Sequence, residues 1–315
     1  MEDAAPKIER ADIEAAFGRI ARRIRRTPIL DLGPGAFGVC AHLELKLELL
    51  QHTGSFKVRG AFNRILSAEV PGAGVIAASG GNFGLAVAYA ARELGHKAEI
   101  FVPETSPAAK IRRIGSLGAV VHVIPGYYEE AFEASRTRAE ETGALVMHAY
   151  DQPEVVAGQG TLGLELSQQV PGADTVLIAV GGGGLIGGVA SWFAGAVRVV
   201  GVEPDRCPTL HAALAAGHPI DVDVGGIAAD SLGASCAGVI GFAAAERFVE
   251  RVVLVPDEAI RDAQLRLWEE VRLIAEAGGV TSLAALLCGA YRPEPNERVV
   301  ALVCGANTDP TSLAR

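Results

Sequence analysis

The feature that most constrains the fold of this 315-residue chain is a run of 23 uncharged residues from Thr175 to Val197. A run of that length is long enough to cross a bilayer as one helix. However, seven of its positions are Gly, and Gly181 to Gly184 are consecutive, which would break a spanning helix. We therefore expect a buried strand, a glycine loop and a helix in this order, and no membrane-spanning segment.

The rest of the chain repeats this alternation of short apolar strands and amphipathic helices. Such a rhythm is typical of parallel sheets covered by helices, so the sequence predicts an α/β fold. One hydrophobic core rarely serves so long a chain, so we expect two domains. The expected strands are 75–78, 98–102, 119–124, 145–148, 175–180, 197–202, 252–255 and 299–303, and the expected helices are 83–94, 108–118, 129–141, 155–169, 185–195, 257–275 and 280–288.

The composition argues against several classes of function. The chain carries 28 Lys and Arg against 37 Asp and Glu, a net charge of −9, whereas nucleic-acid binding needs clustered positive charge. Its five Cys include no CxxC pair, so neither a zinc ribbon nor a thioredoxin-type motif is indicated. Sparse, unpaired thiols are typical of a reducing compartment. We therefore expect a cytoplasmic protein that binds neither nucleic acid nor membranes.

The tetraglycine loop has the pattern of a phosphate site. Backbone N–H groups at a strand-to-helix turn can surround a phosphate, and a tight turn alone would not need four consecutive Gly. The segment also satisfies GxGxxG through Gly182, Gly184 and Gly187, and Glu203 follows 21 residues after Gly182, at a strand end. That is the dinucleotide fingerprint with its ribose-binding acid. A nicotinamide-dependent oxidoreductase is therefore a competing interpretation.

Three further segments contain residues suited to chemistry. Lys57 lies in Ser-Phe-Lys-Val-Arg-Gly-Ala, where packed neighbours would lower its pKa and allow a Schiff base with an aldehyde; an ordinary surface lysine is the simpler explanation. Residues 79–82, Ser-Gly-Gly-Asn, separate a strand from a helix and suit either an anion site or a helix cap. Cys304 follows the last strand, where it either reaches a ligand or fills the core.

Taken together, these segments resemble the fold-type II pyridoxal-phosphate enzymes, above all the serine/threonine dehydratases and serine racemases. The matching segments, in order, are Ser55 to Ala61, Ser79 to Asn82, the tetraglycine loop and Cys304-Gly305-Ala306-Asn307. The resemblance implies a large cofactor-binding domain of residues 1–65 and 152–315, a small inserted domain of residues 66–151, and a homodimer. The dinucleotide interpretation gives Lys57 and Cys304 no role, so it ranks second.

The resemblance also implies a role for each matching position. Lys57 would hold the cofactor covalently and remove the Cα proton of the substrate. Phe56 would pack against the pyridine ring, Asn82 would hydrogen-bond the 3′-oxygen, and Cys304 would face the ring nitrogen. Glu276 matches an acidic position near the cofactor. The phosphate would bind the backbone N–H groups of Gly181, Gly182, Gly183, Gly184 and Leu185, and the substrate carboxylate would bind the loop of Ser79, Gly80, Gly81 and Asn82.

The thiol at position 304 bears on the type of reaction. A thiol is a weak donor and a weak acceptor, so it would leave the ring nitrogen largely unprotonated. Prompt loss of a β-leaving group is then favoured over a long-lived carbanion. The sequence therefore predicts an ammonia-lyase that converts a small β-hydroxy amino acid, such as L-threonine or L-serine, to a 2-oxo acid and ammonia. Serine racemase and 3-hydroxyaspartate dehydratase are the alternatives.

Several positions depart from the family pattern. Racemases carry Ser where this chain has Gly80, so racemisation would lack an acid/base group on the second face of Cα. Thr209 replaces an acidic partner of Glu203, and hydroxyl and carbonyl oxygens suit a monovalent cation better than Mg²⁺. We therefore expect K⁺ or Na⁺ at Glu203, Thr209 and the carbonyl of Cys207. Asp230 falls where relatives often have Gly, and would contact the ring, contact the substrate or cap a helix.

Overall fold

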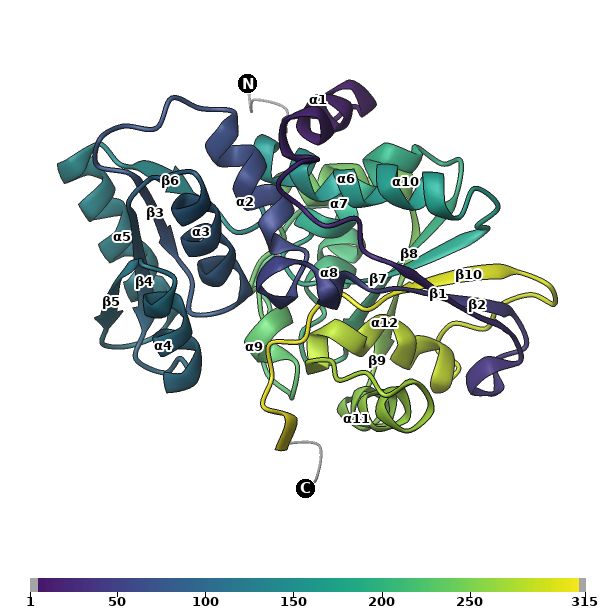
Figure 1. Ribbon diagram of the computed structural model, residues 1–315. Coiled ribbons are helices and arrows are strands. Elements are labelled where there is room, and N and C mark those ends of the chain that lie inside the picture. The colour runs from purple at the N-terminus through teal and green to yellow at the C-terminus, as the bar shows by residue number, and fades with distance from the viewer. Residues whose placement is uncertain (1–4, 312–315) are drawn as a thin grey trace.

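The computed structural model describes residues 5–311, which form two separate sheets covered by helices (Figure 1). The sheets are built from strands that alternate with helices along most of the chain, as the sequence predicts. The strands are β1 (Ile29–Pro34), β2 (His42–Lys46), β3 (Val75–Ala78), β4 (Ala98–Pro103), β5 (Val120–Ile124), β6 (Leu145–Met147), β7 (Thr175–Ala179), β8 (Arg198–Pro204), β9 (Val249–Val255) and β10 (Arg298–Leu302).

The helices cover both faces of the sheets, and within the described residues none is long and apolar enough to cross a membrane. The α-helices are α1 (Arg10–Ile20), α2 (Lys57–Leu66), α3 (Asn82–Glu93), α4 (Ala108–Ser116), α5 (Tyr128–Thr142), α6 (Pro153–Gln169), α7 (Gly184–Phe193), α8 (Thr209–Ala216), α9 (Ala229–Leu232), α10 (Val239–Phe248), α11 (Asp257–Arg266) and α12 (Ala277–Leu287). Shorter turns are η1 (Ala36–Gly38), η2 (Glu48–Leu50), η3 (His52–Gly54) and the π-turn η4 (Leu267–Val271).

The larger sheet has the strand order β1-β2-β10-β7-β8-β9. Its strands run parallel except for β1, which pairs antiparallel with β2 at the edge. Strand β7 is buried at every position, as expected for a central strand with helices on both faces. Because the parallel strands end at the same edge, the glycine loop after β7 and Cys304 after β10 lie at that edge.

The smaller sheet has the order β5-β4-β3-β6 and is parallel throughout. Together with α3, α4 and α5 it forms the lobe seen on the left of Figure 1. Its strands all lie between Val75 and Met147, within the segment predicted to be inserted. The domain boundaries at 65/66 and 151/152 remain a prediction, and residues 1–4 and 312–315 of the predicted large domain lie outside the described residues.

One expected helix is wrong in its extent. The pattern predicts a helix over residues 257–275, whereas α11 ends at Arg266 and passes into the π-turn η4. The chain then leaves the helix at Arg272, which adopts a left-handed conformation with φ of 64°. The side-chain amide of Gln264 donates to the Ala275 carbonyl across this break (2.9 Å). The break brings Glu276 to the N-cap position of α12.

Glycines allow α6 and α7 to cross at backbone contact. A Cβ placed on Gly188 would lie 2.4 Å from the carbonyl oxygen of Val156 and 2.6 Å from the amide nitrogen of Gly160. No side chain fits in that space. Some glycines of the uncharged run therefore serve helix packing, while those before α7 remain available for a ligand.

Candidate active site

Lys57 is the first residue of α2, and a strand-like contact fixes the chain just before it. Ser55 forms an isolated antiparallel bridge with Gly305, and the Phe56 N–H donates to the Cys304 carbonyl (3.3 Å). These bonds hold the first motif against the last one, which lies directly after β10. The structure thus brings the segment of Lys57 next to Cys304.

The Lys57 amine lies in a poorly solvated pocket. Its Nζ donates to the carbonyl of Ala149 (3.1 Å) and lies 5.2 Å from the ring centre of Phe56 and 5.9 Å from that of Phe83. Burial lowers the pKa of Lys57 to about 8, although the acidic groups of Cys304 and Glu276 oppose the shift. A lysine with such a pKa has a substantial neutral fraction near neutral pH, as a nucleophile or base requires.

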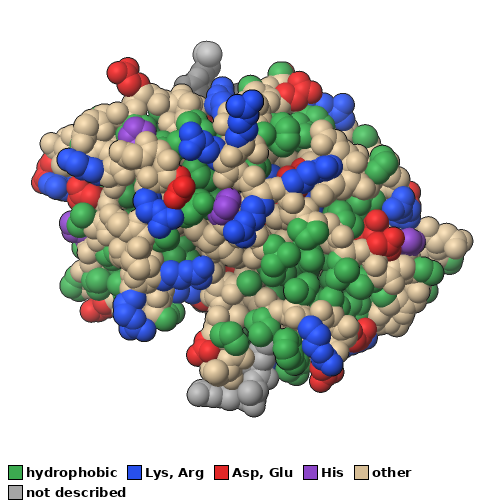
Figure 2. Space-filling view, viewed as in Figure 1, with side chains coloured by type: hydrophobic (Ala, Val, Ile, Leu, Met, Phe, Trp, Pro, Cys, Tyr) green, Lys and Arg blue, Asp and Glu red, His purple; other side chains and the backbone are tan. Residues whose placement is uncertain are grey.

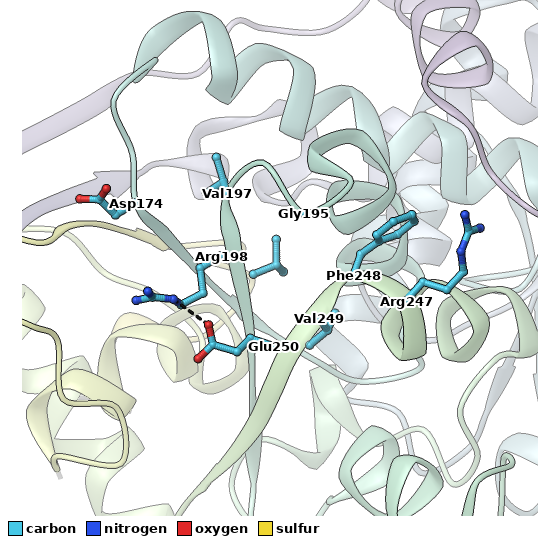
Figure 3. Close-up of a pocket in the computed structure, with 9 residues that line it drawn as sticks. Asp174, Gly195, Val197, Arg198, Arg247, Phe248, Val249 and Glu250 are labelled. Atoms are coloured by element: carbon cyan, nitrogen blue, oxygen red, sulfur yellow. Dashed lines mark ion pairs between the residues drawn. The ribbon is translucent and has the colours of Figure 1, made fainter.

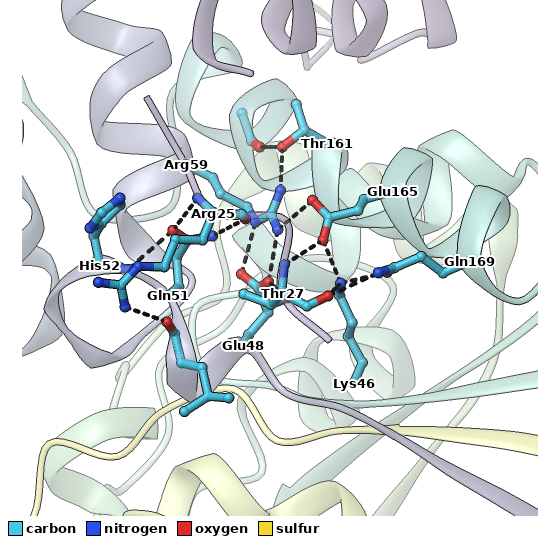
Figure 4. A network of polar contacts seen from close by, with 12 residues as sticks. Arg25, Thr27, Lys46, Glu48, Gln51, His52, Arg59, Thr161, Glu165 and Gln169 are labelled. Atoms are coloured by element: carbon cyan, nitrogen blue, oxygen red, sulfur yellow. Dashed lines mark hydrogen bonds and ion pairs between the residues drawn. The ribbon is translucent and has the colours of Figure 1, made fainter. Parts of the chain in front are cut away.

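A buried ionic network anchors α2 to its neighbouring elements (Figure 4). Arg59 donates to both carboxylate oxygens of Glu48 (2.8 and 2.7 Å) and to Glu165 on α6 (3.0 Å). Lys46 on β2 also pairs with Glu165 (2.5 Å) and donates to the Thr27 carbonyl (2.8 Å). Its charged members are all under 5% exposed, so the network ties β2, α2 and α6 together two residues from Lys57.

The tetraglycine loop leads from β7 into α7 with its amides at the helix N-terminus. Gly183 has φ of 89° and is the N-cap of α7, a conformation that favours Gly. The ring of Tyr150 lies over the loop, because a Cβ on Gly182 would meet it at 2.5 Å. The first amides of a helix have no partner within it and attract anions. The loop therefore has the geometry of a phosphate site.

Asn82 begins α3 and is held from two sides. Its amide nitrogen donates to Glu276 Oε1 (2.6 Å), and its Oδ1 accepts from Asn307 Nδ2 (2.7 Å). The second oxygen of Glu276, Oε2, is buried without a hydrogen-bond partner among the described residues. Burial raises the pKa of Glu276 to about 7, partly opposed by the bond from Asn82. An unpartnered buried carboxylate oxygen indicates room for a polar ligand group.

Cys304 is 4% exposed, and its Sγ lies 3.6 Å from the Gly278 carbonyl. Burial, and to a lesser extent the nearby Glu276, raises the pKa of its thiol to about 12. At neutral pH the side chain is therefore an uncharged thiol. A neutral thiol is the state that the resemblance implies for the residue facing the ring nitrogen.

Contacts from α4 join the two lobes across the region between the two sheets, which is called the crevice below. Lys110 pairs with the exposed Asp230 of α9 (2.5 Å), and Arg113 donates to Asn307 Oδ1 (2.6 Å). The Asp230 carbonyl is 3.6 Å from a Cβ placed on Gly81, so Asp230 borders the loop of residues 79–82. Its side chain forms an ion pair with the opposite lobe and lies inside α9 rather than at its N-cap.

The three residues of the predicted cation site lie around the start of α8. Glu203 is fully buried and accepts from the N–H groups of Leu210 (2.7 Å) and His211 (2.9 Å). The Thr209 hydroxyl donates to the Ala234 carbonyl (2.7 Å), and the Cys207 thiol lies 3.0 Å from the Gly225 carbonyl. The dinucleotide interpretation assigns the Glu203 carboxylate to a ribose, but both of its oxygens accept hydrogen bonds from backbone N–H groups of α8.

A hollow of about 460 Å³ elsewhere on the molecule does not belong to this site (Figure 3). It is lined by residues at the starts of β7, β8 and β9, among them Asp174, Arg198 and Val249. Arg198 and Glu250 form an ion pair there (2.6 Å). The glycine loop and Cys304 follow the ends of their strands, so the hollow lies at the opposite edge of the larger sheet.

Sequence reasoning missed several residues around the site. Tyr150 covers the glycine loop, Asn307 connects Asn82 to Arg113, and Lys110 and Arg113 reach across from α4. Asn307 ends the last of the matching segments, but the resemblance assigns it no role. The position of Asn307, a polar residue shortly after the last strand, is a signal that could have pointed to a site residue. The sequence around Lys110 and Arg113 contains no such signal.

Comparisons with known proteins agree with this geometry. A family model described as "Pyridoxal-phosphate dependent enzyme" matches residues 20–305. An L-threonine ammonia-lyase of Thermotoga maritima is 38% identical over 96% of this chain and 77% of its own length. Among solved structures, maize serine racemase superposes with a TM-score of 0.93 at 32% identity, covering 98% of this chain and 96% of that one. A threonine deaminase of Solanum lycopersicum gives 0.89 at 30% identity, covering 99% and 90%.

Proposed function

Because this chain belongs to the pyridoxal-phosphate dependent enzyme family, we propose that it is an ammonia-lyase acting on a small β-hydroxy amino acid. Its substrates are L-threonine or L-serine, and its products are a 2-oxo acid and ammonia. The observation that carries the proposal is the position of Lys57, with its pKa lowered to about 8, beside Cys304. The similarity to threonine ammonia-lyases over nearly the whole chain supports the reaction type.

The residues of the crevice fit the cofactor. The amides of Gly181, Gly182, Gly183, Gly184 and Leu185 would hold its phosphate, Asn82 its 3′-oxygen, Phe56 one face of the ring and Cys304 the ring nitrogen. Two observations support this fit. The unpartnered Oε2 of Glu276 is available to a polar ligand atom, and side chains at Gly182 or Gly184 would collide with Tyr150, so the loop between β7 and α7 presents only backbone there.

When bound, the cofactor withdraws electrons from the substrate Cα and makes its proton acidic. The neutral Lys57 amine takes that proton, since its lowered pKa keeps part of it unprotonated near neutral pH. The uncharged Cys304 thiol does not protonate the ring nitrogen, which favours prompt departure of the β-hydroxyl; the hydroxyl leaves as water by taking up a proton equivalent to the one that Lys57 removes. The resulting enamine hydrolyses to the 2-oxo acid and ammonia.

A second candidate is serine racemase, favoured by the TM-score of 0.93 to the maize enzyme. The threonine ammonia-lyases, at 36–38% identity, favour elimination. Gly80 also carries no hydroxyl of its own in the substrate loop. We therefore rank the lyase first, and 3-hydroxyaspartate remains a third substrate to include in assays.

The function is tested by adding L-threonine to the purified protein and measuring 2-oxobutanoate and ammonia. A visible absorbance band that disappears on borohydride treatment reports the covalent cofactor. Lys57→Ala should remove that covalent link and lower turnover by at least about 10²–10⁴-fold, the range for a lost general base. Peptide mapping that places the reduced cofactor on another lysine would contradict the assignment.

Three finer properties are part of the proposal. A monovalent cation, K⁺ or Na⁺, would bind Glu203, Thr209 and the Cys207 carbonyl. The enzyme would work in the cytoplasm, in keeping with its sparse cysteines. It would be a homodimer, supported by the hydrophobic side chains that gather over the region of β1 and α12 in Figure 2. In β1, Ile29 and Leu30 are only partly buried.

A further inference from the structure

The space beside Gly80 is filled by a hydroxyl group from another loop. A Cβ placed on Gly80 would lie 2.0 Å from the Oγ of Ser106 and 2.8 Å from its Cβ. The next neighbour, Pro103 Cδ, is 3.8 Å away. Distances under 3.0 Å do not occur for real Cβ atoms, so Ser106 occupies the position that a side chain at residue 80 would take.

The topology explains why these two residues meet. Gly80 follows β3 and Ser106 follows β4, and these are neighbouring parallel strands. The Ser79 N–H donates to the Phe101 carbonyl (2.9 Å), and the Ser106 N–H donates to the Pro103 carbonyl in a tight turn (3.0 Å). Both loops therefore lie beyond the carboxyl ends of the strands, where α/β sheets bind their ligands.

The Ser106 hydroxyl is available to a ligand. The residue is partly buried, and its Oγ has no hydrogen-bond partner among residues 5–311. It directly precedes Pro107, the N-cap of α4, and α4 also carries Lys110 and Arg113 on the crevice side. A helix N-terminus and two cations make this side of the crevice favourable for an anion.

We propose that Ser106 adds a side-chain hydrogen-bond donor beside the substrate loop, at the position of Gly80, and binds the substrate carboxylate together with the amides of residues 79–82. The hydroxyl that Gly80 lacks thus comes from a position 26 residues further along the chain. This inference rests on the proposed function for its ligand, but the fit of Gly80 to Ser106 does not depend on it. Gly80→Ser alone would collide with Ser106 and would not add a usable hydroxyl.

The packing arm of the test measures thermal unfolding of the purified protein. Gly80→Ala should lower Tm by roughly 2–10 °C, the usual cost of overpacking in a protein of this size. Adding Ser106→Gly should recover most of the loss, because it removes both close atoms. Gly81→Ala is the matched control, since its Cβ would meet nothing closer than 3.6 Å. The proposal would be overturned if Gly80→Ala did not lower Tm, or if adding Ser106→Gly did not restore the lowered Tm.

The ligand arm measures glycine binding to the cofactor-loaded protein by calorimetry, since glycine has no β-leaving group. Ser106→Ala should weaken binding about 10-fold or more, as expected for a lost bond to a charged group. It should also raise KM for L-threonine, leave kcat nearly unchanged and preserve the absorbance of the bound cofactor. Ser106→Thr, which keeps the hydroxyl, should retain most of the affinity.

Two results in the ligand arm would overturn the binding role. The first is glycine affinity that does not change in Ser106→Ala. The second is a loss of racemisation without a loss of binding: the wild type forms D-serine from L-serine, Ser106→Ala does not, and the two have the same KM. That result would make Ser106 an acid/base group instead. Failure of the proposed function itself is distinguishable, because it would show as absent cofactor absorbance or absent 2-oxo acid in the wild type.

Discussion

Among single residues, Lys57 shows how burial prepares a chemical group. An exposed lysine has a pKa of about 10.4, whereas burial lowers that of Lys57 to about 8. Only the neutral amine can attack the cofactor aldehyde. The rate of cofactor uptake by cofactor-free protein should therefore rise with pH and level off above about pH 8. Absorbance-monitored uptake between pH 6 and 10, at fixed cofactor concentration, checks this, and a rate still rising at pH 10 would contradict it.

Glu203 leads to a second prediction for a single residue, because its pKa is raised rather than lowered. Burial raises its pKa to about 8, although the N–H groups of Leu210 and His211 oppose the shift. Because the folded-state pKa exceeds the unfolded value, Glu203 contributes most to stability below about pH 4, and that contribution is lost as pH rises through about 8. Urea unfolding across this range in a buffer without K⁺ or Na⁺ should show the fall, and Glu203→Gln should show less of it.

The proposed cation would act on the same carboxylate. A bound K⁺ favours the charged form of Glu203, so adding K⁺ near pH 8 should recover stability in the wild type but not in Glu203→Gln. Activity should likewise respond to K⁺ and resist EDTA. A strict requirement for Mg²⁺ that chelation abolishes would show that the site takes a divalent ion.

Between elements, the buried network of Arg59 joins β2, α2 and α6. Arg59→Ala would leave Glu48 buried without its cation, so we expect a loss of about 3–5 kcal/mol in the free energy of unfolding. Urea unfolding measures the loss, and the exposed Arg22→Ala is the control expected to change it by about 0.5 kcal/mol or less. A loss under about 1 kcal/mol for Arg59→Ala would mean that water reaches the network.

The same elements show which parts of the structure the sequence could predict. Most of the alternating strands and helices from 75 to 202 and from 252 to 302 follow from apolar periodicity and glycine stops, because both are local signals, whereas α8, α9 and α10 between these ranges were not expected. The antiparallel edge pair of β1 and β2 was missed, since His42, Glu44 and Lys46 make β2 look polar. The network was missed because charged residues suggest exposure, and only tertiary packing makes partners of Arg59 and Glu165.

The residues of the candidate site likewise differ in how far the sequence could predict them. Lys57, Asn82, the glycine loop and Cys304 lie in compact motifs, so their positions could be predicted from the resemblance. Ser106 could not, because its relation to Gly80 depends on the pairing of β3 with β4. Lys110 and Arg113 likewise gain their partners only across the crevice.

For the molecule as a whole, the apolar area over β1 and α12 (Figure 2) bears on assembly. Exposed apolar areas of this kind commonly mark protein–protein contacts, and homo-oligomers most often pair through one shared surface. Sedimentation equilibrium should give twice the chain mass of 32.6 kDa. A mass equal to one chain across micromolar concentrations would contradict the homodimer.

The bridge between Ser55 and Gly305 has a consequence for the order of events during synthesis. The residues around Lys57 leave the ribosome early, whereas Cys304 and Gly305, which fix their position, are among the last of the site to be made. The pocket is therefore incomplete on a nascent chain, however well its first half has folded. Cofactor capture must therefore wait until residue 304 has been made, and a chain released before that residue would leave Lys57 without the backbone contacts that hold its segment in place.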